Sequence, residues 1–590
     1  MKWEVPTMRS RTSLCNRADL RVDFTRFAPL WALYTVGLAA GIMMCLPQCR
    51  TAYYTATTLS DLAGVMAPVQ FGYALVIAQC LFGYLYDTRL CYAIHAMPQT
   101  RPCRFRSHVL AGLLFAWIPD LLGAGLCLLI APEMEIAVAW WLVSVCGQYL
   151  FFYGFAVLSV LCAGNRVGGV LVYGIGNFLP LLAAWLAGAV FQPLLFGITV
   201  PTEPFSIACP LVQLTQEDYL TIVAPRVDAE FNRILEAMYP NGERMGYLAL
   251  CCGCSLVFLF LAGRLYRKRN LEAAGELLAV KALRPLFLLV FTLASGALFQ
   301  LFASVFAGST AYGYLLAGIV VGYFVGRMLL ARQVNVFQLR AIPGIAAICA
   351  VFFALLLLTG LDVTGIIRSI PAEDSIASVS VIPYARNNGQ GVTSEDPGDI
   401  QAVLALHRGE VDRWKSWRQE NRGISGLLTE TYQRNLDSKD SETIWLTLRY
   451  RLKDGRTLER EYVVDFHSQG GSIAEEFLNR PENILGVKDR SELRTLAFQE
   501  VEIYGNWECG TYCTVDDVQG LLNAIYDDCE AGRYRLRYLE DLEDTEYVSH
   551  IYFRLDDDET IFVYVYDSQT ATASFLKDHV RPFPEDRKNS

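Results

Sequence analysis

Nine apolar runs fill most of the first 361 of the 590 residues, and each is long enough to cross a lipid bilayer as a helix. A bilayer core requires about 20 predominantly apolar residues per helix, and a helix satisfies its own backbone hydrogen bonds there. The sequence therefore predicts a polytopic α-helical membrane protein with about nine spans. The runs are residues 27–46, 63–86, 108–131, 136–163, 170–198, 246–266, 286–307, 313–331 and 341–361.

The first run is expected to stay in the protein as a span. It follows residues 1–26, which carry six Lys or Arg residues, and it lacks the small-x-small cleavage site of a signal peptide. We interpret 1–26 as a cytoplasmic, basic, interfacial segment and 27–361 as the transmembrane domain.

Basic residues alternate between the loops, and this alternation predicts the orientation of the chain. Segment 1–26, loop 87–107, residues 264–284 and the loop after the eighth run are rich in Lys and Arg, whereas 47–62 holds only Arg50. Cytoplasmic loops carry such an excess of positive charge. The N-terminus is therefore expected in the cytoplasm, and nine spans place the C-terminal part outside the cytoplasm. A count wrong by one span would reverse that last placement.

The charge of the chain changes sign near residue 370. Residues 1–370 hold 25 Lys and Arg against 18 Asp and Glu, and residues 371–590 hold 25 against 42. Together with 53% hydrophobic residues, this argues against a soluble enzyme and against a disordered chain. Nucleic-acid binding is disfavoured, because the C-terminal part is acidic and membrane topology explains the basic loops.

The acidic part contains two weakly similar halves, 371–490 and 491–590, and is predicted to form an extracytoplasmic α+β domain. Residues 399–404 and 517–522 each place apolar side chains on one helix face. A hairpin follows in each half, at 444–465, with the turn pair Asp454-Gly455, and at 551–565. Short strands at 377–383 and 501–504 are expected to open the halves, and Phe-Leu pairs at 477–478 and 575–576 to close them.

A few residues of the apolar runs invite a functional or a packing interpretation. Asp120 follows Pro119 inside the third run, and a carboxylate at that depth usually faces a cavity or a partner. It is either part of a transport pathway or a hydrogen-bonding group between helices. Small residues four apart let helices approach closely, so we predict packing roles for the glycines at two such stripes: Gly37 and Gly41, and Gly318, Gly322 and Gly326.

Two connecting segments are distinctive. Loop 87–107 is basic and amphipathic, and it is either an ordinary inside loop or a docking element for a cytoplasmic partner. Segment 200–245 forms a long outer connection between the fifth and sixth runs. Within it, the apolar spacing over 222–238 is consistent with a surface or interfacial helix.

The remaining chemistry-bearing residues form no catalytic pattern. Fourteen of the 17 cysteines lie in 1–370, where Cys acts as a small apolar residue. Cys509 and Cys513 lack the neighbours of a zinc site and could form a disulfide outside the cytoplasm. The sequence holds no Walker A P-loop, H-E-x-x-H or G-x-S-x-G motif, and we expect no metal site and no catalytic activity in this chain.

Three stretches resemble permease subunits of bacterial ABC transporters, in the type 2 exporter-like group found in Firmicutes. Residues 24–34, FTRFAPLWALY, resemble the opening "R-F-x-P-[IL]-W-x-L-Y" of those chains. Residues 84–89 and 95–101 resemble "Y-L-x-x-x-R … H-x-[LM]-P-x-x-R" in the first inside loop. Residues 446–456 and 460–462 resemble the "L-x-Y-x-L-x-[ND]-G-[KR] … R-E-Y" stretch of a C-terminal domain of unassigned function. The usual core of the group has six spans, against nine here.

The resemblance implies a transport subunit that hydrolyses nothing itself. ATP would act through a separate ATPase subunit, and no cofactor would be bound by this chain. A second permease subunit, identical or related, would complete the transporter in the cell membrane. Contacts to the ATPase would come from the inside loop, at Arg89, Arg101, Arg104 and Arg106, and Asp120 would lie on the transport pathway.

Two rival functions remain open. A membrane-anchored extracytoplasmic sensor or interaction protein, for example in antimicrobial-compound or envelope-stress response, would use the spans only to hold its outer domain. An integral membrane enzyme acting on lipid or cell-wall precursors would require clustered His, Asp or Glu at a membrane interface, which the sequence does not show.

Overall fold

The computed structural model describes most of residues 15–582, and the chain divides into two compact units. One, here called the helical unit, comprises Met1–Leu186 and Pro201–Cys349; the other, the C-terminal unit, comprises Ala187–Val200 and Ala350–Ser590. Within 15–582 the structure leaves out residues 50, 98, 193, 201–202, 217, 224–225, 228–232, 270–273, 308–311, 338–341, 384–391, 421–442, 466–467, 488, 495, 497, 508–509, 534–546, 556–559 and 567–568.

Among the described residues, nine helices are long and apolar enough to cross a membrane, as the sequence predicted. They are α2 (Ala28–Cys45), α3 (Ala52–Phe82), α5 (Arg101–Ile130), α6 (Glu135–Cys162), α7 (Arg166–Phe191), α10 (Gly242–Lys268), α11 (Arg284–Ala307), α12 (Tyr312–Ala331) and α13 (Ile342–Gly360). Several begin earlier than the apolar runs, because polar first turns extend the helices beyond the apolar stretch.

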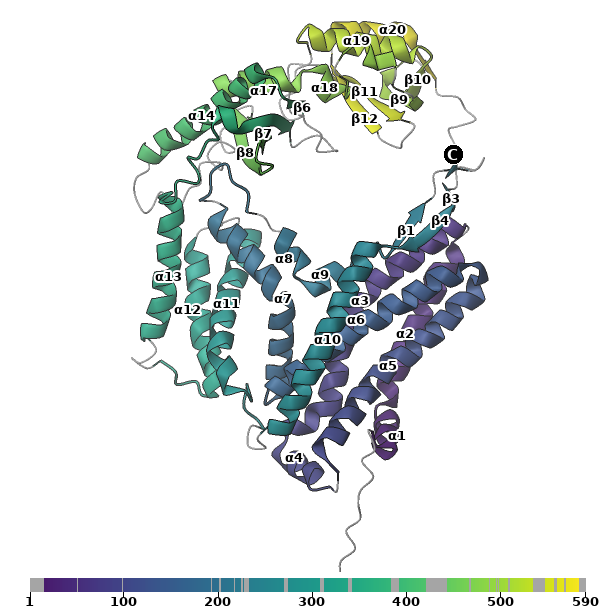
Figure 1. Ribbon diagram of the computed structural model, residues 1–590, viewed down its shortest axis with the longest axis vertical. Helices are drawn as coiled ribbons and strands as arrows, with labels where there is room; N and C mark the ends of the chain where they lie inside the picture. Colours follow the sequence, from purple (N-terminus) through teal and green to yellow (C-terminus); the bar gives the residue numbers. More distant parts are fainter. Residues whose placement is uncertain are drawn as a thin grey trace, which may run out of the picture. The chain divides into compact units, whose positions relative to one another are not determined.

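Helix α6 is the centre of the larger bundle in the helical unit (Figure 1). It packs against α3, α5 and α10, and its middle is almost entirely buried, including Trp141, Tyr149 and Tyr153. Helices α2 and α1 (Arg17–Arg26) pack against α5, while α11 and α12 form a separate close pair. Short helices α4 (Thr88–His95), α8 (Glu203–Ile207) and α9 (Pro210–Leu214) lie in the connections.

The connection between α7 and α10 contains strands, so the helix predicted over 222–238 is wrong. Strand β1 (Leu220–Val223) pairs antiparallel with β4 (Ala237–Pro240), and β2 (Arg226–Val227) pairs with β3 (Arg233–Ile234). The apolar spacing that fits one helix face also fits two short β-ribbons. The sequence places Pro225 inside the stretch, and proline removes a helical hydrogen bond.

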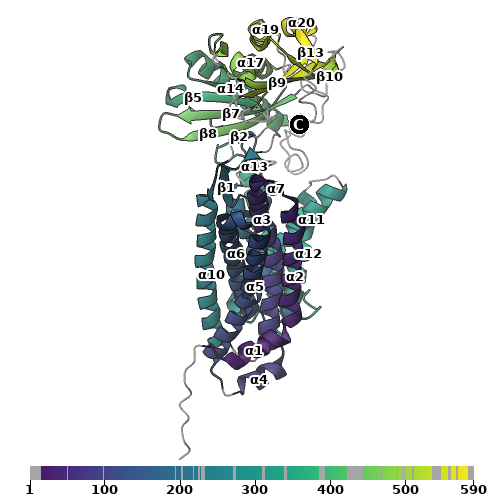
Figure 2. The ribbon, with the colours of Figure 1, turned by 90° about the vertical axis from the view of Figure 1, so that its right-hand side faces the viewer.

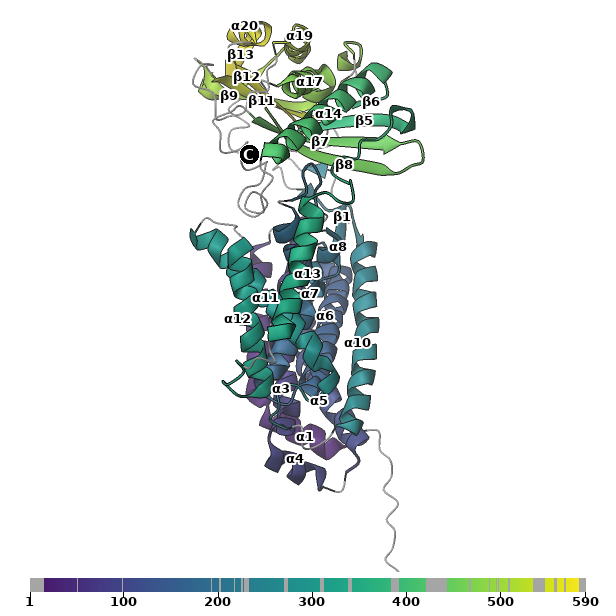
Figure 3. The ribbon, with the colours of Figure 1, turned by 90° about the vertical axis from the view of Figure 1, so that its left-hand side faces the viewer.

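The C-terminal unit contains two antiparallel sheets with helices (Figure 2, Figure 3). The first sheet has the order β6-β5-β7-β8, and α14 and α17 pack together and against it. Its elements are β5 (Ile376–Pro383), β6 (Val392–Ser394), α14 (Pro397–Glu420), β7 (Thr443–Leu452), β8 (Thr457–Asp465) and α17 (Gln469–Leu478), followed by α18 (Pro481–Ile484).

The second sheet has the order β12-β11-β9-β10-β13, and α19 and α20 pack together beside it. Its elements are β9 (Phe498–Trp507), β10 (Gly510–Val515), α19 (Val518–Glu530), β11 (Tyr547–Leu555), β12 (Thr560–Tyr566), α20 (Thr570–His579) and β13 (Val580–Pro582).

The predicted helix faces and hairpins of this unit are confirmed. Ile400, Val403 and Leu404 of α14 and Leu521 and Leu522 of α19 are buried. Both hairpins form, β7–β8 and β11–β12. Gly455 adopts φ +86° in the first turn, a conformation that glycine reaches at little cost.

Candidate functional sites in the helical unit

Helix α4 forms at the start of the basic segment 87–107 because Asp87 caps it. The Asp87 Oδ1 atom accepts hydrogen bonds from the backbone N–H groups of Arg89 and Leu90, at 2.8 and 3.2 Å. These donors have no partner within a helix, so a capping carboxylate stabilises the first turn. Of the predicted loop 87–107, residues 88–95 therefore form the short helix α4, and residues 101–107 form the first turns of α5.

Three arginines attach α4 and its neighbours to one another, and we call Arg101, Arg104 and Arg269 the arginine corner. Arg104 is only 4% exposed and bonds the Gln99 Oε1 atom through Nε and Nη2, at 3.2 and 3.1 Å, and the backbone carbonyl of Ile94. Since Ile94 lies in the last turn of α4, Arg104 adds a second donor to a carbonyl that also accepts from the backbone N–H of Met97 at 3.3 Å.

The other two arginines of the corner bond the ends of further helices. Arg101 Nη1 donates to the carbonyls of Arg267 and Arg269, at 3.1 and 3.3 Å, at the end of α10. Arg269 is buried and donates to the carbonyl of Leu161, at 2.7 Å, near the end of α6, and to that of Leu85, at 3.4 Å. The corner therefore connects α4, α5, α6 and α10 as one rigid assembly.

The histidine of α4 belongs to this structure. His95 Nδ1 lies 2.8 Å from the carbonyl of Cys91. Burial, reinforced by the charges of the arginine corner, lowers the pKa of His95. The ring is accordingly neutral at pH 7, with Nδ1–H donating to the carbonyl, and it closes the last turn of α4.

The opposite side of α4 is exposed and carries both charge and apolar area. Arg89 is exposed, Leu90 is 51% exposed and Tyr92 is 53% exposed. Arg106, one turn into α5, is also exposed. Of the four arginines predicted to contact an ATPase, Arg89 and Arg106 thus present their side chains to solvent. Arg101 is half-buried, and Arg104 is occupied by bonds within the chain.

Asp120 is fully buried in a polar cluster formed by α2, α3 and α5. Tyr34 Oη donates to Asp120 Oδ1 at 2.9 Å, and Gln70 Nε2 donates to the same hydroxyl at 3.1 Å. The Asp120 Oδ2 and Gln70 Oε1 atoms are buried and accept no hydrogen bond from the described residues. The cluster can therefore take up a proton or a hydrogen-bond donor, which is the chemistry expected of an intramembrane carboxylate.

Aromatic rings enclose this cluster. Tyr73 stacks on Tyr34 with 4.4 Å between ring centroids, and its hydroxyl bonds the carbonyl of Phe115 at 3.1 Å. The sequence singled out Asp120 alone. Tyr34, Gln70 and Tyr73 escaped notice because single aromatic and amide residues inside apolar runs carry no spacing signal.

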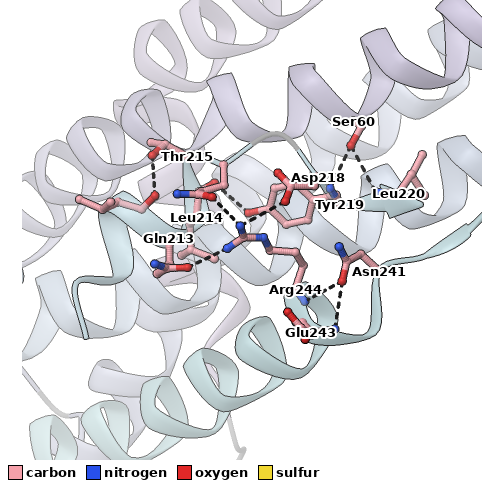
Figure 4. Close-up of polar contacts among 12 residues, drawn as sticks. Ser60, Gln213, Leu214, Thr215, Asp218, Tyr219, Leu220, Asn241, Glu243 and Arg244 are labelled. Atoms are coloured by element: carbon pink, nitrogen blue, oxygen red, sulfur yellow. Dashed lines mark hydrogen bonds and ion pairs between the residues drawn. The ribbon is translucent and has the colours of Figure 1, made fainter. Parts of the chain in front are cut away.

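The segment before α10 is held against α3, the middle of α6 and the start of α10 by a polar clasp (Figure 4). The Ser60 hydroxyl accepts from the backbone N–H groups of Tyr219 and Leu220, at 2.9 and 3.2 Å. Gln148 donates to the Tyr219 hydroxyl at 2.7 Å. Arg244 donates to the side-chain oxygen of Gln213 at 2.7 Å and pairs with Asp218 at 3.3 Å. The connection between α7 and α10 is therefore a cover bonded to these three helices.

Helix α1 is also attached to the bundle. His108 Nδ1 lies 2.7 Å from Asp23 Oδ2, and both side chains are largely buried. The backbone N–H of Asn16, before α1, donates to the Ser107 hydroxyl at 2.9 Å. The predicted basic N-terminal segment thus ends in a helix bonded to the start of α5, while residues 1–14 lie outside the described part of the chain.

The two glycine stripes behave differently. A Cβ on Gly318 or Gly322 would overlap atoms of α11, and one on Gly326 would lie 2.9 Å from a Leu288 methyl carbon. These glycines therefore let α12 and α11 pack closely. A Cβ on Gly37 or Gly41 would meet no described atom within 4 Å, so these two glycines mediate no close helix contact among the described residues, and the packing role predicted for them stays a prediction.

The cysteine prediction stays untested. Cys513 is buried on β10, whereas Cys509 lies outside the described residues.

Comparison of the chain with protein-family models, curated proteins and solved structures finds no match. A function can therefore be proposed only from the sequence and structure of this chain.

Proposed function

We propose that this chain is the transmembrane permease subunit of an ATP-driven ABC transporter, working with a separate ATPase subunit and a second permease subunit. The observation that carries the proposal is the construction of α4. One side of it is bonded through the arginine corner to the ends of α5, α6 and α10, and the other exposes Arg89, Leu90 and Tyr92. A partner that grips the exposed side would move several helix ends together, which a subunit driven by a separate motor requires.

The proposed setting is the cell membrane, with the N-terminus and α4 in the cytoplasm and the C-terminal unit outside. The nine apolar helices support multiple crossings. The Lys and Arg residues around α4, at the end of α10 and before α11 support the orientation, because such residues concentrate in cytoplasmic loops.

We further propose that the C-terminal unit arose by duplication of one α+β element. Strands β5, β6, β7 and β8 pair in the order 6-5-7-8, and β9, β10, β11 and β12 pair in the corresponding order 10-9-11-12. In both sets a helix separates the second and third strands, and another follows the fourth. This supports the two similar halves that the sequence predicted.

On this proposal the transport pathway passes Asp120. Two buried acceptors without a partner among the described residues, on Asp120 and Gln70, suit a substrate or proton that carries donor groups. The cover held by Ser60 and Arg244 (Figure 4) would have to shift for the outer end to open.

The test is co-purification of the tagged full-length chain from its native host in mild detergent, followed by mass spectrometry. A stoichiometric P-loop ATPase is expected with the wild-type chain. The double variant Arg89→Ala/Tyr92→Ala should lose it, because both side chains are exposed on α4, whereas Lys268→Ala, also exposed at the end of α10, should keep it. Recovery of the same ATPase with the double variant would refute the role of α4.

The rival function is a membrane-anchored sensor or interaction protein. The C-terminal unit, with its two sheets and their packed helices, favours this function. Absence of any ATPase in several mild detergents would support the sensor and overturn the permease proposal.

A further inference from the structure

Two segments that directly follow apolar helices belong structurally to the C-terminal unit. The first connection is residues 192–200, directly after α7, and the second is residues 361–369, directly after α13. The first connection leads from α7 to α8, and the second leads from α13 towards β5, so each is continuous with the end of a candidate span.

The first connection is bonded to strand β8. The backbone N–H of Glu461 donates to the carbonyl of Gly197 at 3.1 Å. Phe196 is 4% exposed and lies against Tyr462, with 5.1 Å between ring centroids, and parallel to Trp414 at 6.2 Å. Gly197 has φ +69° and abuts the Tyr462 ring so closely that any Cβ would overlap it. Only glycine fits there without strain.

The same connection is closed onto the end of α7. Gln192 Nε2 donates to the carbonyl of Ile198 at 3.1 Å, and Gln192 Oε1 accepts from the backbone N–H of Val200 at 2.7 Å. Because α7 ends at Phe191, these two bonds attach Ile198 and Val200 to the residue that directly follows the helix. A movement of residues 196–198 therefore reaches the end of α7.

The second connection is bonded to the residue next to these on β8. Arg460 Nη2 donates to the carbonyl of Ile366 at 3.3 Å and to the Ser369 hydroxyl at 3.0 Å. Asp362, two residues after α13, accepts from the backbone N–H of Ile367 at 3.2 Å and from Arg368 Nε at 2.9 Å. The end of α13 and the stretch held by Arg460 therefore form one compact turn.

The surroundings of these residues are polar and incompletely satisfied. Arg460 is 4% exposed, and the oxygens of Glu459, Ile366 and Ser369 that accept from it are neutral. The Arg460 Nε, Tyr462 Oη, His407 Nε2 and Glu410 Oε2 atoms are buried and bond no described residue. Buried polar groups are normally paired, so these unpaired atoms leave donors and acceptors of the described residues free to re-pair when the surrounding elements shift.

We propose that Arg460, Glu461 and Tyr462, here called the β8 joint, couple the C-terminal unit to α7 and α13. A displacement of β8 relative to α14, caused by a partner or ligand held by the C-terminal unit, shifts both connections in concert and so biases the two helices. Only the consequence of this coupling depends on the proposed function. In a transporter the β8 joint would change the positions of the spans, and in a sensor it would pass a signal from the C-terminal unit to the spans.

Coupling of this kind is reciprocal, since a change at one connection must alter the other by the same free energy. Arg460 touches the second connection and Gly197 belongs to the first. Removal of either contact is therefore expected to loosen both connections, whereas a purely local role would loosen one.

The experiment is hydrogen–deuterium exchange of the full-length chain in lipid nanodiscs, read at residues 194–200, at 361–369 and in the last turns of α7 and α13. Arg460→Ala should accelerate exchange about tenfold in the second connection, as expected for loss of a buried charged hydrogen bond, and severalfold in the first. Gly197→Ala should show the converse pattern. Arg460→Lys should restore part of the protection.

The matched control is Arg449→Ala on β7, because Arg449 is exposed and pairs with Glu459 at 2.6 Å without touching either connection. This control variant should leave the exchange rates of both connections unchanged. If Gly197→Ala fails to fold, Phe196→Leu and Ser369→Ala perturb the same two sides more mildly. Acceleration confined to the mutated side in these variants overturns the proposal.

The readout requires no ATPase. If each substitution loosens both connections in a chain that co-purifies with no ATPase, the β8 joint is supported and only the transporter is refuted. If an ATPase co-purifies but each substitution loosens only its own connection, the transporter is supported and the joint is refuted.

Discussion

Two buried titratable residues on α14 make the stability of the C-terminal unit depend on pH in opposite directions. Glu410 is 1% exposed, and burial raises its pKa from 4.5 to about 7, with Asp465 adding and Arg413 opposing. His407 is fully buried, and burial, with the charges of Arg460 and Arg408, lowers its pKa from 6.5 to about 4.

The sign of each contribution follows from which state binds protons more tightly. The folded state holds the Glu410 proton more tightly than the unfolded state does. Its stabilising contribution is therefore complete below pH 4.5 and is lost as pH rises through about 7. The unfolded state holds the His407 proton more tightly, so that contribution is complete above pH 6.5 and is lost as pH falls through about 4. Each difference corresponds to about 3 kcal/mol.

The two slopes nearly cancel in the wild-type chain, and single substitutions should expose them. Relative to wild type, Glu410→Gln should become more stable by about 3 kcal/mol between pH 4.5 and pH 7, because it lacks the carboxylate that must ionise in the core. His407→Phe should instead lose about 3 kcal/mol relative to wild type as pH rises from about 4 to 6.5.

The assay is urea unfolding of the C-terminal unit in the full-length chain, followed by pulse proteolysis at several pH values. The difference between variant and wild type cancels the contributions of the other carboxylates. Asp412→Asn on the same helix is the control, because Asp412 is exposed and pairs with Lys415. A difference profile for Glu410→Gln as flat as that of the control would refute the argument from burial.

Four further substitutions test the helical unit. Arg104→Ala should lower the thermal stability by about 2–4 kcal/mol in nanodiscs, because it removes a buried guanidinium that donates to the Ile94 carbonyl and twice to the Gln99 side-chain oxygen. Asp120→Asn keeps an acceptor for Tyr34, so its free energy of unfolding should stay within about 1 kcal/mol of the wild-type value. Transport by the native cells should nevertheless be lost, and retained transport would show that Asp120 is not on the pathway. Gly322→Leu should cost about 1–3 kcal/mol in a thermal melt by forcing α12 from α11, whereas Gly41→Leu should cost almost nothing. Ser60→Ala should accelerate amide exchange at 219–220 about tenfold, since two buried N–H groups lose one acceptor, and unchanged exchange would show that the cover is held elsewhere.

The strongest sequence signals identified the elements that depend on local chemistry. Nine apolar runs gave nine helices among the described residues, because length and hydropathy together exclude most alternatives. The Asp454-Gly455 pair identified the β7–β8 turn, since glycine relieves the positive φ there. Helix α4 could have been recognised from Asp87 followed by a short amphipathic stretch, as capping carboxylates are a sequence feature.

The misses share a different cause, which is dependence on neighbours remote in sequence. The spacing over 222–238 fits a helix face, yet β1 pairs with β4 once both lie against α3 and α6. The charge of Arg104 predicts an inside loop by the excess of basic residues, but only the positions of Ile94 and Gln99 show that its guanidinium is used within the fold.

The glycine stripes show the limit of such patterns most clearly. Gly37 and Gly41 have the same four-residue spacing as Gly318 and Gly322, and both pairs permit a second helix to approach. Only α12 has such a neighbour among the described residues. A sequence pattern therefore states what a surface allows, while the contact that uses it is decided by the rest of the fold. The same reasoning applies to α4, whose exposed Arg89 and Tyr92 allow a partner that only the co-purification can identify.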